Sequence, residues 1–140
     1  MADRSTLKEN LRYLRFVVYA IVLAYIWIQY EFSTDSWDYS NGQAKVTGQH
    51  INGKDEGTWT WFYSNGKKQM QGDFVHGKRS GVWVICDSSG NKISQTNYVN
   101  DKLNGEFVRW YASGNIESRG VYKDDKMIES ESFNLDGSKK

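Results

Sequence analysis

Proline is absent from the 140 residues, cysteine occurs once and histidine twice. The single cysteine, Cys86, excludes an intramolecular disulfide framework. The lack of proline, together with thirteen glycines and 15 % aromatic residues, favours many short strands joined by tight turns. A dominant charge is also missing, because the net charge is +1 and acidic and basic residues are interspersed. Nucleic-acid binders carry a clustered basic surface, so we expect no nucleic-acid partner.

The side chains that catalysis needs are scarce. His50 and His76 are the only histidines, and we interpret them as a substituted strand-end residue and a solvated turn residue. One cysteine and two histidines give no spacing typical of zinc ligands, and Cys86 is interpreted as a small strand residue. The glycines follow a hairpin period, so none forms a phosphate-binding loop before a helix. We therefore predict no enzyme activity, no catalytic residue, no cofactor and no metal site.

One long apolar run, residues 16–28, lies near the N-terminus. Extended to Tyr13–Phe32, it reaches the roughly 20 residues that a bilayer-spanning helix needs. The charges Arg15 and Glu31 stand at its ends, and Trp27 suits an interfacial aromatic belt. We predict an N-terminal segment over residues 1–12 and a transmembrane signal anchor over residues 13–32. Two alternatives are a soluble helix packed on the following domain and a cleaved signal peptide, although residues 28–32 offer no small-x-small cleavage site.

The flanking charges predict the orientation of this anchor. Lys8, Arg12 and Arg15 precede it, whereas Glu31 and two aspartates follow it. Under the positive-inside bias the N-terminus is then cytoplasmic and the remaining chain extracytoplasmic. We expect a single-pass protein, in a bacterium on the periplasmic side of the inner membrane.

A 24-residue period runs through residues 33–128. The segment from Gly57 to Gly66 recurs 24 residues later, recurs again 24 residues after that, and has a degenerate first copy from residue 33. The closing position of each unit is a lysine, in order Lys54, Lys78, Lys102 and Lys126. Agreement without one insertion predicts four structural repeats, with residues 129–140 as a degenerate C-terminal cap or tail.

Each repeat is predicted to be a β-hairpin. The pair Asn65-Gly66 and its equivalents favour a two-residue type I′ loop between the two strands. With that loop Trp61 faces Met70 and Trp59 faces Gly72, so that Gly72 leaves room for the Trp59 ring. Short polar connections between hairpins then predict an all-β fold, an elongated antiparallel meander of hairpin repeats preceded by one transmembrane α-helix.

The pattern Gly-x-Trp-x-x-x-Tyr-x-Asn-Gly, followed by Gly-x-aromatic-x-x-Gly-Lys, resembles the MORN repeat. It is most similar to the bacterial variant catalogued as YwqK-type antitoxin repeats, over roughly residues 33–128. The resemblance implies a membrane-associated or partner-binding scaffold, or an antitoxin. The sequence departs from the pattern where Asp87 replaces the strand tyrosine, Thr96 the strand glycine, and Asp101 and Asp125 the turn glycine.

Two features are candidate binding sites. The first is a stripe of aromatic side chains on one face of the predicted sheet: Trp37, Trp59, Trp61, Tyr63, Trp83, Phe107 and Tyr111. The second is the ladder of closing lysines, Lys54, Lys78, Lys102 and Lys126, spaced about 10 Å apart along one edge. The alternatives are a stripe that is buried on itself and lysines that are simply solvated.

These observations predict a membrane-anchored protein-interaction scaffold, an accessory subunit of an envelope membrane complex. Its expected partners are another, membrane-associated protein and the bilayer around residues 13–32. One alternative is an antitoxin or immunity protein that neutralises a toxin. Another is the binding of lipid headgroups or cell-wall glycan by the lysines and aromatic rings.

Overall fold

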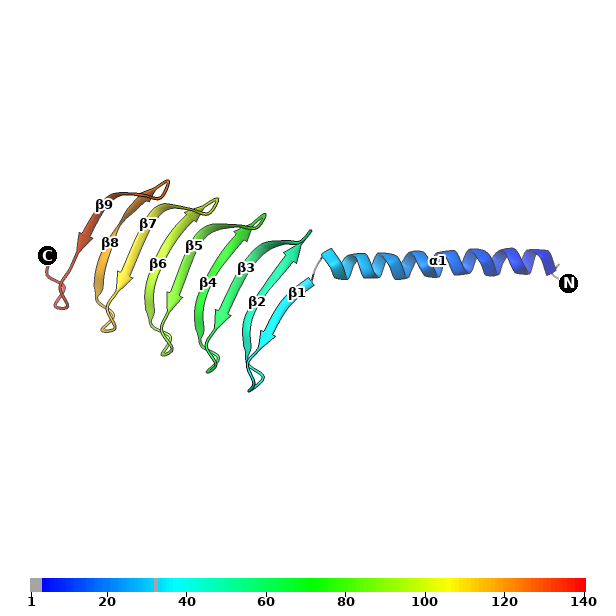
Figure 1. The fold of residues 1–140 in the computed structure, drawn as a ribbon, viewed down its shortest axis with the longest axis horizontal. Helices are drawn as coiled ribbons and strands as arrows, with labels where there is room; N and C mark the ends of the chain where they lie inside the picture. Colours follow the sequence, from blue (N-terminus) through cyan, green and yellow to red (C-terminus); the bar gives the residue numbers. More distant parts are fainter. Residues whose placement is uncertain (1–3, 32) are drawn as a thin grey trace.

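The computed structural model describes the backbone of residues 4–31 and 33–140, and the side chains of residues 13–28 and 37–140. One helix, α1 (Arg4–Glu31), precedes a single nine-stranded antiparallel sheet whose strand order follows the chain (Figure 1). The strands are β1 (Ser33–Asp38), β2 (Ala44–Ile51), β3 (Lys54–Phe62), β4 (Lys68–Val75), β5 (Lys78–Cys86), β6 (Lys92–Val99), β7 (Lys102–Trp110), β8 (Ile116–Lys123) and β9 (Lys126–Ser132). The predicted meander of hairpin repeats is confirmed.

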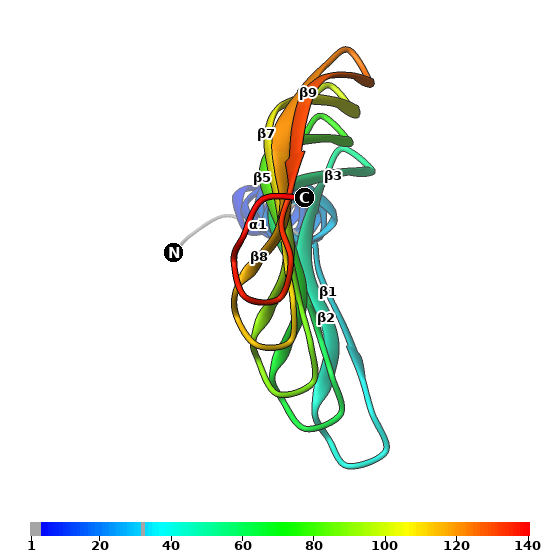
Figure 2. The same cartoon turned by 90° about the vertical axis from the view of Figure 1, so that its left-hand side faces the viewer.

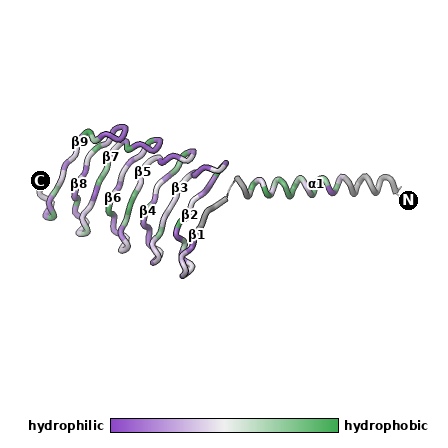
Figure 3. The backbone as a smooth tube through the Cα atoms, in the orientation of Figure 1, coloured by the Kyte–Doolittle hydropathy of each residue, from purple (hydrophilic) through white to green (hydrophobic). Residues whose placement is uncertain are grey.

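Helix α1 projects from the first strand and leaves the sheet along the direction in which the strands are stacked (Figure 1). It contains neither proline nor glycine, and its 28 residues extend about 42 Å. Every described side chain from Tyr13 to Ile28 is exposed, and the coloured part of the helix is largely apolar (Figure 3). The alternative of a helix packed on the sheet is therefore wrong.

A helix that crosses a bilayer must be both long and apolar. In the part of the chain that the structure describes, no helix is long and apolar enough to do so.

The loop inside each hairpin has three residues, not two. In the second repeat the Tyr63 N–H donates to the Lys67 carbonyl at 2.8 Å, and the Gly66 N–H donates to the Tyr63 carbonyl at 2.9 Å. Gly66 has a φ of 81°, whereas Asn65 keeps a negative φ, as in a type I turn followed by a left-handed glycine. The type I′ loop predicted at Asn65-Gly66 is therefore wrong.

The predicted strand register is nevertheless confirmed. Trp61 pairs with Met70, and Trp59 pairs with Gly72. A bulge after Trp61 shifts the register by one residue and offsets the extra loop residue. The extra loop residue and the bulge therefore compensate each other. Each side chain stays on the face of the sheet that strand alternation predicts for it.

The type I′ loops lie at the opposite end of the hairpins, between one repeat and the next. Both central residues have positive φ at Asn52-Gly53, His76-Gly77, Asn100-Asp101 and Asp124-Asp125. Asn and Asp tolerate this conformation better than other residues with a Cβ, which explains why an aspartate can replace the turn glycine here. The last three of these loops also fold back onto the start of the strand that follows the loop before them, as where the Gly77 N–H donates to the Asp55 carbonyl at 2.9 Å and the Asp101 N–H to the Arg79 carbonyl at 3.1 Å.

The core of this single-layer sheet consists of large rings lying over glycines. Its buried hydrophobic residues are Val46, Trp59, Trp83 and Phe107. A Cβ added to Gly72 would overlap three ring atoms of Trp83, and one added to Gly48 would overlap the Trp59 ring. The recurring glycine thus makes room for tryptophan, as predicted, but the ring comes from the following repeat and not from the same hairpin.

The C-terminal residues continue the repeat geometry. Strand β9 runs across the boundary expected between residues 128 and 129 and pairs with β8. The loop after it repeats the three-residue form, because the Asn134 N–H donates to the Ser138 carbonyl at 2.8 Å and the Gly137 N–H to the Asn134 carbonyl at 2.9 Å. A half-hairpin therefore covers the outer edge of the fourth repeat.

Candidate binding surfaces

Strand alternation divides the side chains between two faces of the sheet, which lie on its two sides in the end-on view of Figure 2. We call the first the aromatic face; its residues include Val46, Trp59, Trp61, Met70, Phe74, Trp83, Ile85, Tyr98, Phe107 and Tyr122. We call the second the polar face; its residues include Thr58, Thr60, Gln71, Asp73, Gln95 and Arg119.

Rings on the aromatic face cover one another. The column begins with His50 against Trp59 at 5.1 Å between ring centroids and continues through Phe74 to Trp83, the last two 5.1 Å apart. Trp59 and Trp83 are only 7 % and 6 % exposed as a result. These two tryptophans and Phe107, all predicted binding residues, therefore form the core of the sheet.

Three other residues of the predicted stripe are half-buried, and their position has a structural cause. Trp61 lies between the Trp59 and Trp83 rings, at 6.0 and 5.8 Å. The hydroxyl of Tyr63 donates to the Cys86 carbonyl at 2.9 Å, and that of Tyr111 to the Phe133 carbonyl at 2.9 Å. These two tyrosines therefore tie their hairpin loops to the chain segment that follows, while Trp37, 68 % exposed, is the freely accessible member of the stripe.

The distal half of the aromatic face is hollowed. Toward the C-terminus the row of Val46, Trp61, Met70 and Ile85 continues as Ser94, Arg109, Ser118 and Ser132. An open hollow of about 460 Å³ lies there, walled by Tyr98, Phe107 and Tyr122 and lined by serine and threonine hydroxyls. We call it the distal hollow. The sequence signal for it is the change to serine at repeat positions that carry large apolar residues in the earlier repeats.

The chemistry of the distal hollow favours binding over catalysis. Its one cationic side chain, Arg109, lies 3.7 Å from the Glu117 carboxylate. Hydroxyls beside aromatic walls can hydrogen-bond and pack against an extended polypeptide or another neutral polar group. Within the described residues, no group of three or more His, Cys, Asp or Glu side chains could hold a metal ion.

The polar face carries a second hollow of about 490 Å³ at the same distal end. Its floor includes Arg119, whose guanidinium contacts the Glu131 carboxylate at 3.0 Å. Hydrogen bonds from Lys139 first and Arg119 second hold the pKa of Glu131 below its ordinary value. The charges of Arg119 and Glu131 are therefore paired with each other, and the hollow is also lined by Glu106 and Glu129.

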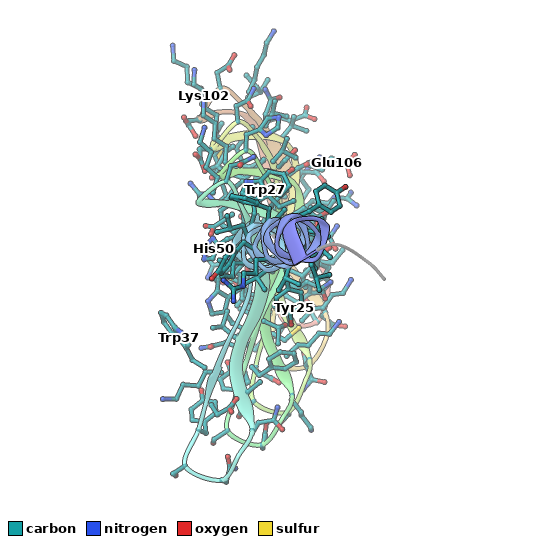
Figure 4. The ribbon with its side chains drawn as sticks, turned by 90° about the vertical axis from the view of Figure 1, so that its right-hand side faces the viewer. Tyr25, Trp27, Trp37, His50, Lys102 and Glu106 are labelled. Atoms are coloured by element: carbon teal, nitrogen blue, oxygen red, sulfur yellow. The ribbon has the colours of Figure 1, made fainter. Side chains whose placement is uncertain are left out.

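The four closing lysines are exposed and begin strands β3, β5, β7 and β9 along the edge formed by the type I′ loops; Lys102 marks this edge in Figure 4. Acidic side chains accompany them. Lys102 lies 3.9 Å from Asp124, and Asp101 accepts hydrogen bonds from the Arg79 backbone N–H at 3.0 Å and its guanidinium at 3.1 Å. The backbone bond first and the guanidinium second hold the pKa of Asp101 below its ordinary value. The edge is therefore mixed in charge.

Both histidines are part of this edge chemistry, which sequence analysis missed. The Nδ1 atom of His50 lies 2.9 Å from the Asp55 carboxylate, and that of His76 lies 3.6 Å from Glu56. Glu56 also accepts a hydrogen bond from the His76 backbone N–H at 2.7 Å. In the sequence, Asp55 and Glu56 follow the Asn52-Gly53 turn, and these acidic residues are the signal for both contacts. Only the folded loops, however, bring them opposite the histidines.

Comparison with known proteins agrees with this architecture. The family model described as MORN repeat variant matches residues 55–76 and 103–124, which are the β3–β4 and β7–β8 hairpins. No curated protein matches the sequence. Among solved structures, a mutant of S. aureus TarM in complex with fondaparinux, α-GlcNAc-glycerol and UDP is similar with a TM-score of 0.42 and 12 % identity, over 76 % of this chain and 23 % of that one. This chain thus spans under a quarter of TarM, and so low a score bears on neither fold nor function. Two hairpins of this chain, β3–β4 and β7–β8, are therefore similar to the MORN repeat variant.

Proposed function

We propose that this chain is a membrane-tethered scaffold whose sheet binds another protein. The observation that carries the proposal is the exposure of the described part of α1: thirteen of the sixteen side chains from Tyr13 to Ile28 are large, apolar and exposed, for example Leu23 at 66 % and Trp27 at 62 %. Removing one such side chain from water stabilises a protein by about 1.5–3 kcal/mol. Their number supports an apolar medium around this part of the helix.

A bilayer suits this helix better than a groove on a partner protein. Between Arg15 and Glu31 the helix has no charged residue. A groove would cover one side of the helix, whereas lipid covers all sides. If the 20 residues from Tyr13 to Phe32 formed one continuous helix, they would extend about 30 Å, the thickness of a bilayer hydrocarbon core. The excess of positive charge before the span favours a cytoplasmic N-terminus and an extracytoplasmic sheet.

The sheet supports the binding half of the proposal. MORN-type repeats are generally protein- or lipid-binding scaffolds. The distal hollow and the half-buried Trp61 and Tyr111 offer aromatic and hydroxyl groups of the kind found at protein interfaces. An accessory subunit of an envelope complex and an antitoxin would both use such a surface. Tagged full-length protein extracted from native membranes in mild detergent would separate the two by the identity of the partner that co-purifies.

Alkaline carbonate extraction of the full chain tests the tether. The wild-type chain should stay in the membrane pellet, because carbonate releases peripheral proteins and leaves inserted helices. The double substitution Val22→Lys with Ile26→Lys should move it to the supernatant, since each lysine at a helix centre costs about 2.5–3.5 kcal/mol of insertion. The matched control places the same two charges in exposed hairpin loops, at Ser64 and Ser113. Release of the wild-type chain by carbonate would refute the tether.

A further inference from the structure

Exposed tryptophan is confined to the first two elements of the chain. Of the six tryptophans, Trp59 and Trp83 are buried, and Trp61 and Trp110 are half-buried. Only Trp27, 62 % exposed, and Trp37, 68 % exposed, present most of their surface to the surroundings. Trp27 lies near the end of α1 and Trp37 near the end of β1, and Figure 4 shows Trp37 projecting from the first strand, to one side of the helix.

Strand β1 is the edge of the sheet on the side where α1 leaves it. The strands lie across the helix axis, so the whole length of β1, about 20 Å, faces the direction in which the helix runs (Figure 1). Among the described residues β1 pairs only with β2, and its other edge has no strand beside it. If α1 crosses a bilayer, β1 is the layer of the sheet nearest to the headgroups.

The repeat explains why Trp37 is exposed. Its equivalent 24 residues later is Trp61, which is covered by a ring on either side, Trp59 and Trp83. Trp37 occupies the same position in the first strand, where the counterpart of Trp59 is Asp35 and supplies no ring. The chain thus has a tryptophan in the first strand where one of the two covering rings is missing.

We propose that β1 lies on the bilayer surface and that the indole of Trp37 inserts into the interfacial layer, as a second attachment point beside α1. This inference rests on the membrane tether proposed above. Indole rings concentrate at the interface because their apolar body enters the acyl boundary while their N–H stays hydrated. Two attachment points would hold the sheet upright, with β9 about 40 Å from the membrane at the usual spacing of strands.

Charge plays little part in this attachment. Asp38 is exposed on the same strand, and Lys45 on the neighbouring strand β2 holds its ammonium 5.2 Å from the centre of the Tyr39 ring. Among the described side chains of β1 and β2, Lys45 is the one lysine or arginine, so attraction to anionic lipid is not the driving force. Insertion should therefore be independent of anionic lipid content and of ionic strength, which separates it from binding by the lysine ladder.

Fluorescence quenching in nanodiscs tests the inference. The full chain carries Cys86→Ala and one new cysteine with an environment-sensitive dye, at position 38 beside Trp37, at Leu135 in the distal loop, or at Val22 in α1. Nitroxide lipids labelled at the headgroup or deep in the acyl chain are the quenchers. We expect headgroup quenching at position 38 to be at least twofold stronger than at position 135, and to fall by half or more after Trp37→Ala. It should be equal in phosphatidylcholine discs with and without phosphatidylglycerol.

The results separate this inference from the tether. Position 38 quenched no more than position 135 overturns the contact of β1 with the bilayer, and equal quenching with Trp37 and Trp37→Ala overturns the role of the indole. In both cases deep quenching at position 22 would show that the tether itself holds. Absence of deep quenching at position 22 would overturn the tether and this inference together. Because Trp37 is exposed, Trp37→Ala should leave the thermal unfolding of the sheet unchanged, and that measurement is the control.

Discussion

The packing of Trp83 over Gly72 gives a sharp test of how this sheet holds together. In Gly72→Ala the new methyl group would occupy the place of three Trp83 ring atoms, so the ring must move. It cannot move sideways, because it packs edge-on against Phe74 at 5.1 Å and Tyr98 at 6.0 Å. The ring must therefore lift off the sheet and expose surface that is 94 % covered in the native structure, where Trp83 is 6 % exposed.

The size of the effect follows from the area involved. A tryptophan buries about 150–250 Å², which at about 25 cal/mol per Å² corresponds to roughly 4–6 kcal/mol for complete exposure. A lifted ring keeps part of its contacts, so Gly72→Ala should lower the free energy of unfolding by about 2–3 kcal/mol, as overpacking in a core typically does. The matched control is Thr96→Ala, because Thr96 holds the same repeat position and already carries a Cβ. It should cost less than about 1 kcal/mol.

The third repeat shows how the clash can be relieved. There Thr96, which is larger than Gly72, pairs with Phe107, whose ring is smaller than that of Trp83. Trp83→Phe alone should lower the free energy of unfolding by about 1–2 kcal/mol, because the smaller ring leaves a cavity. In the Gly72→Ala background the same change relieves the overlap between the ring and the new methyl group. The double variant should therefore be more stable than the sum of the single changes predicts, by about 1–2 kcal/mol.

Urea unfolding of the full chain in detergent micelles, followed by circular dichroism, measures these changes. Amide hydrogen exchange in β4 and β5 locates them, since each repeat contacts only its neighbours and can open locally. A cost for Gly72→Ala below about 0.5 kcal/mol, or simple additivity in the double variant, would refute ring-over-glycine packing as the source of stability.

Two further predictions concern the ties between repeats. Tyr63→Phe removes the hydroxyl that donates to the Cys86 carbonyl and should lower the free energy of unfolding by about 1 kcal/mol in the same urea assay, whereas Tyr19→Phe on α1, away from the sheet, should change it little. The lowered pKa of Asp101 means that its ionised form stabilises the fold at neutral pH, and that this contribution disappears as the pH falls below about 4 and the carboxylate takes up a proton. Asp101→Asn should therefore flatten the dependence of Tm on pH between about 6 and 3, and an unchanged slope would contradict it.

The architecture can be predicted from the sequence because the same pattern of residues recurs in successive repeats. Period, strand count per repeat and register all follow from positions that recur every 24 residues. The type of turn does not follow, because Asn-Gly occurs both at Asn65-Gly66 and at Asn52-Gly53. Local preference is identical at the two sites. Only the second is a type I′ loop, and the difference lies in the bulge near the first, which depends on pairing between strands.

The candidate site is harder to predict because exposure is decided between repeats. Period two places Trp37, Trp59 and Trp61 on one face, but it does not tell which ring covers which. The overlap of Trp83 with Gly72 crosses from one hairpin to the next, and Trp61 is covered by Trp59 of its own strand and by Trp83 of the following repeat. The same repeat position is therefore half-buried at Trp61 and exposed at Trp37.

The departures from the repeat converge on the join between β6 and β7. Where other repeats have a tyrosine tied to the next repeat, Asp87 accepts hydrogen bonds from the Ser89 N–H at 2.8 Å and the Asn91 N–H at 2.9 Å of its own loop. The aromatic column reaches Tyr98, and a separate pair, Phe107 and Tyr122 at 5.0 Å, follows it. The backbone ladder is continuous across this join, and a side-chain contact, Lys92 over the Trp110 ring at 5.7 Å, crosses it in place of the tyrosine hydrogen bond. Serines replace large apolar residues beside the join, and the distal hollow therefore opens where the column of rings is interrupted.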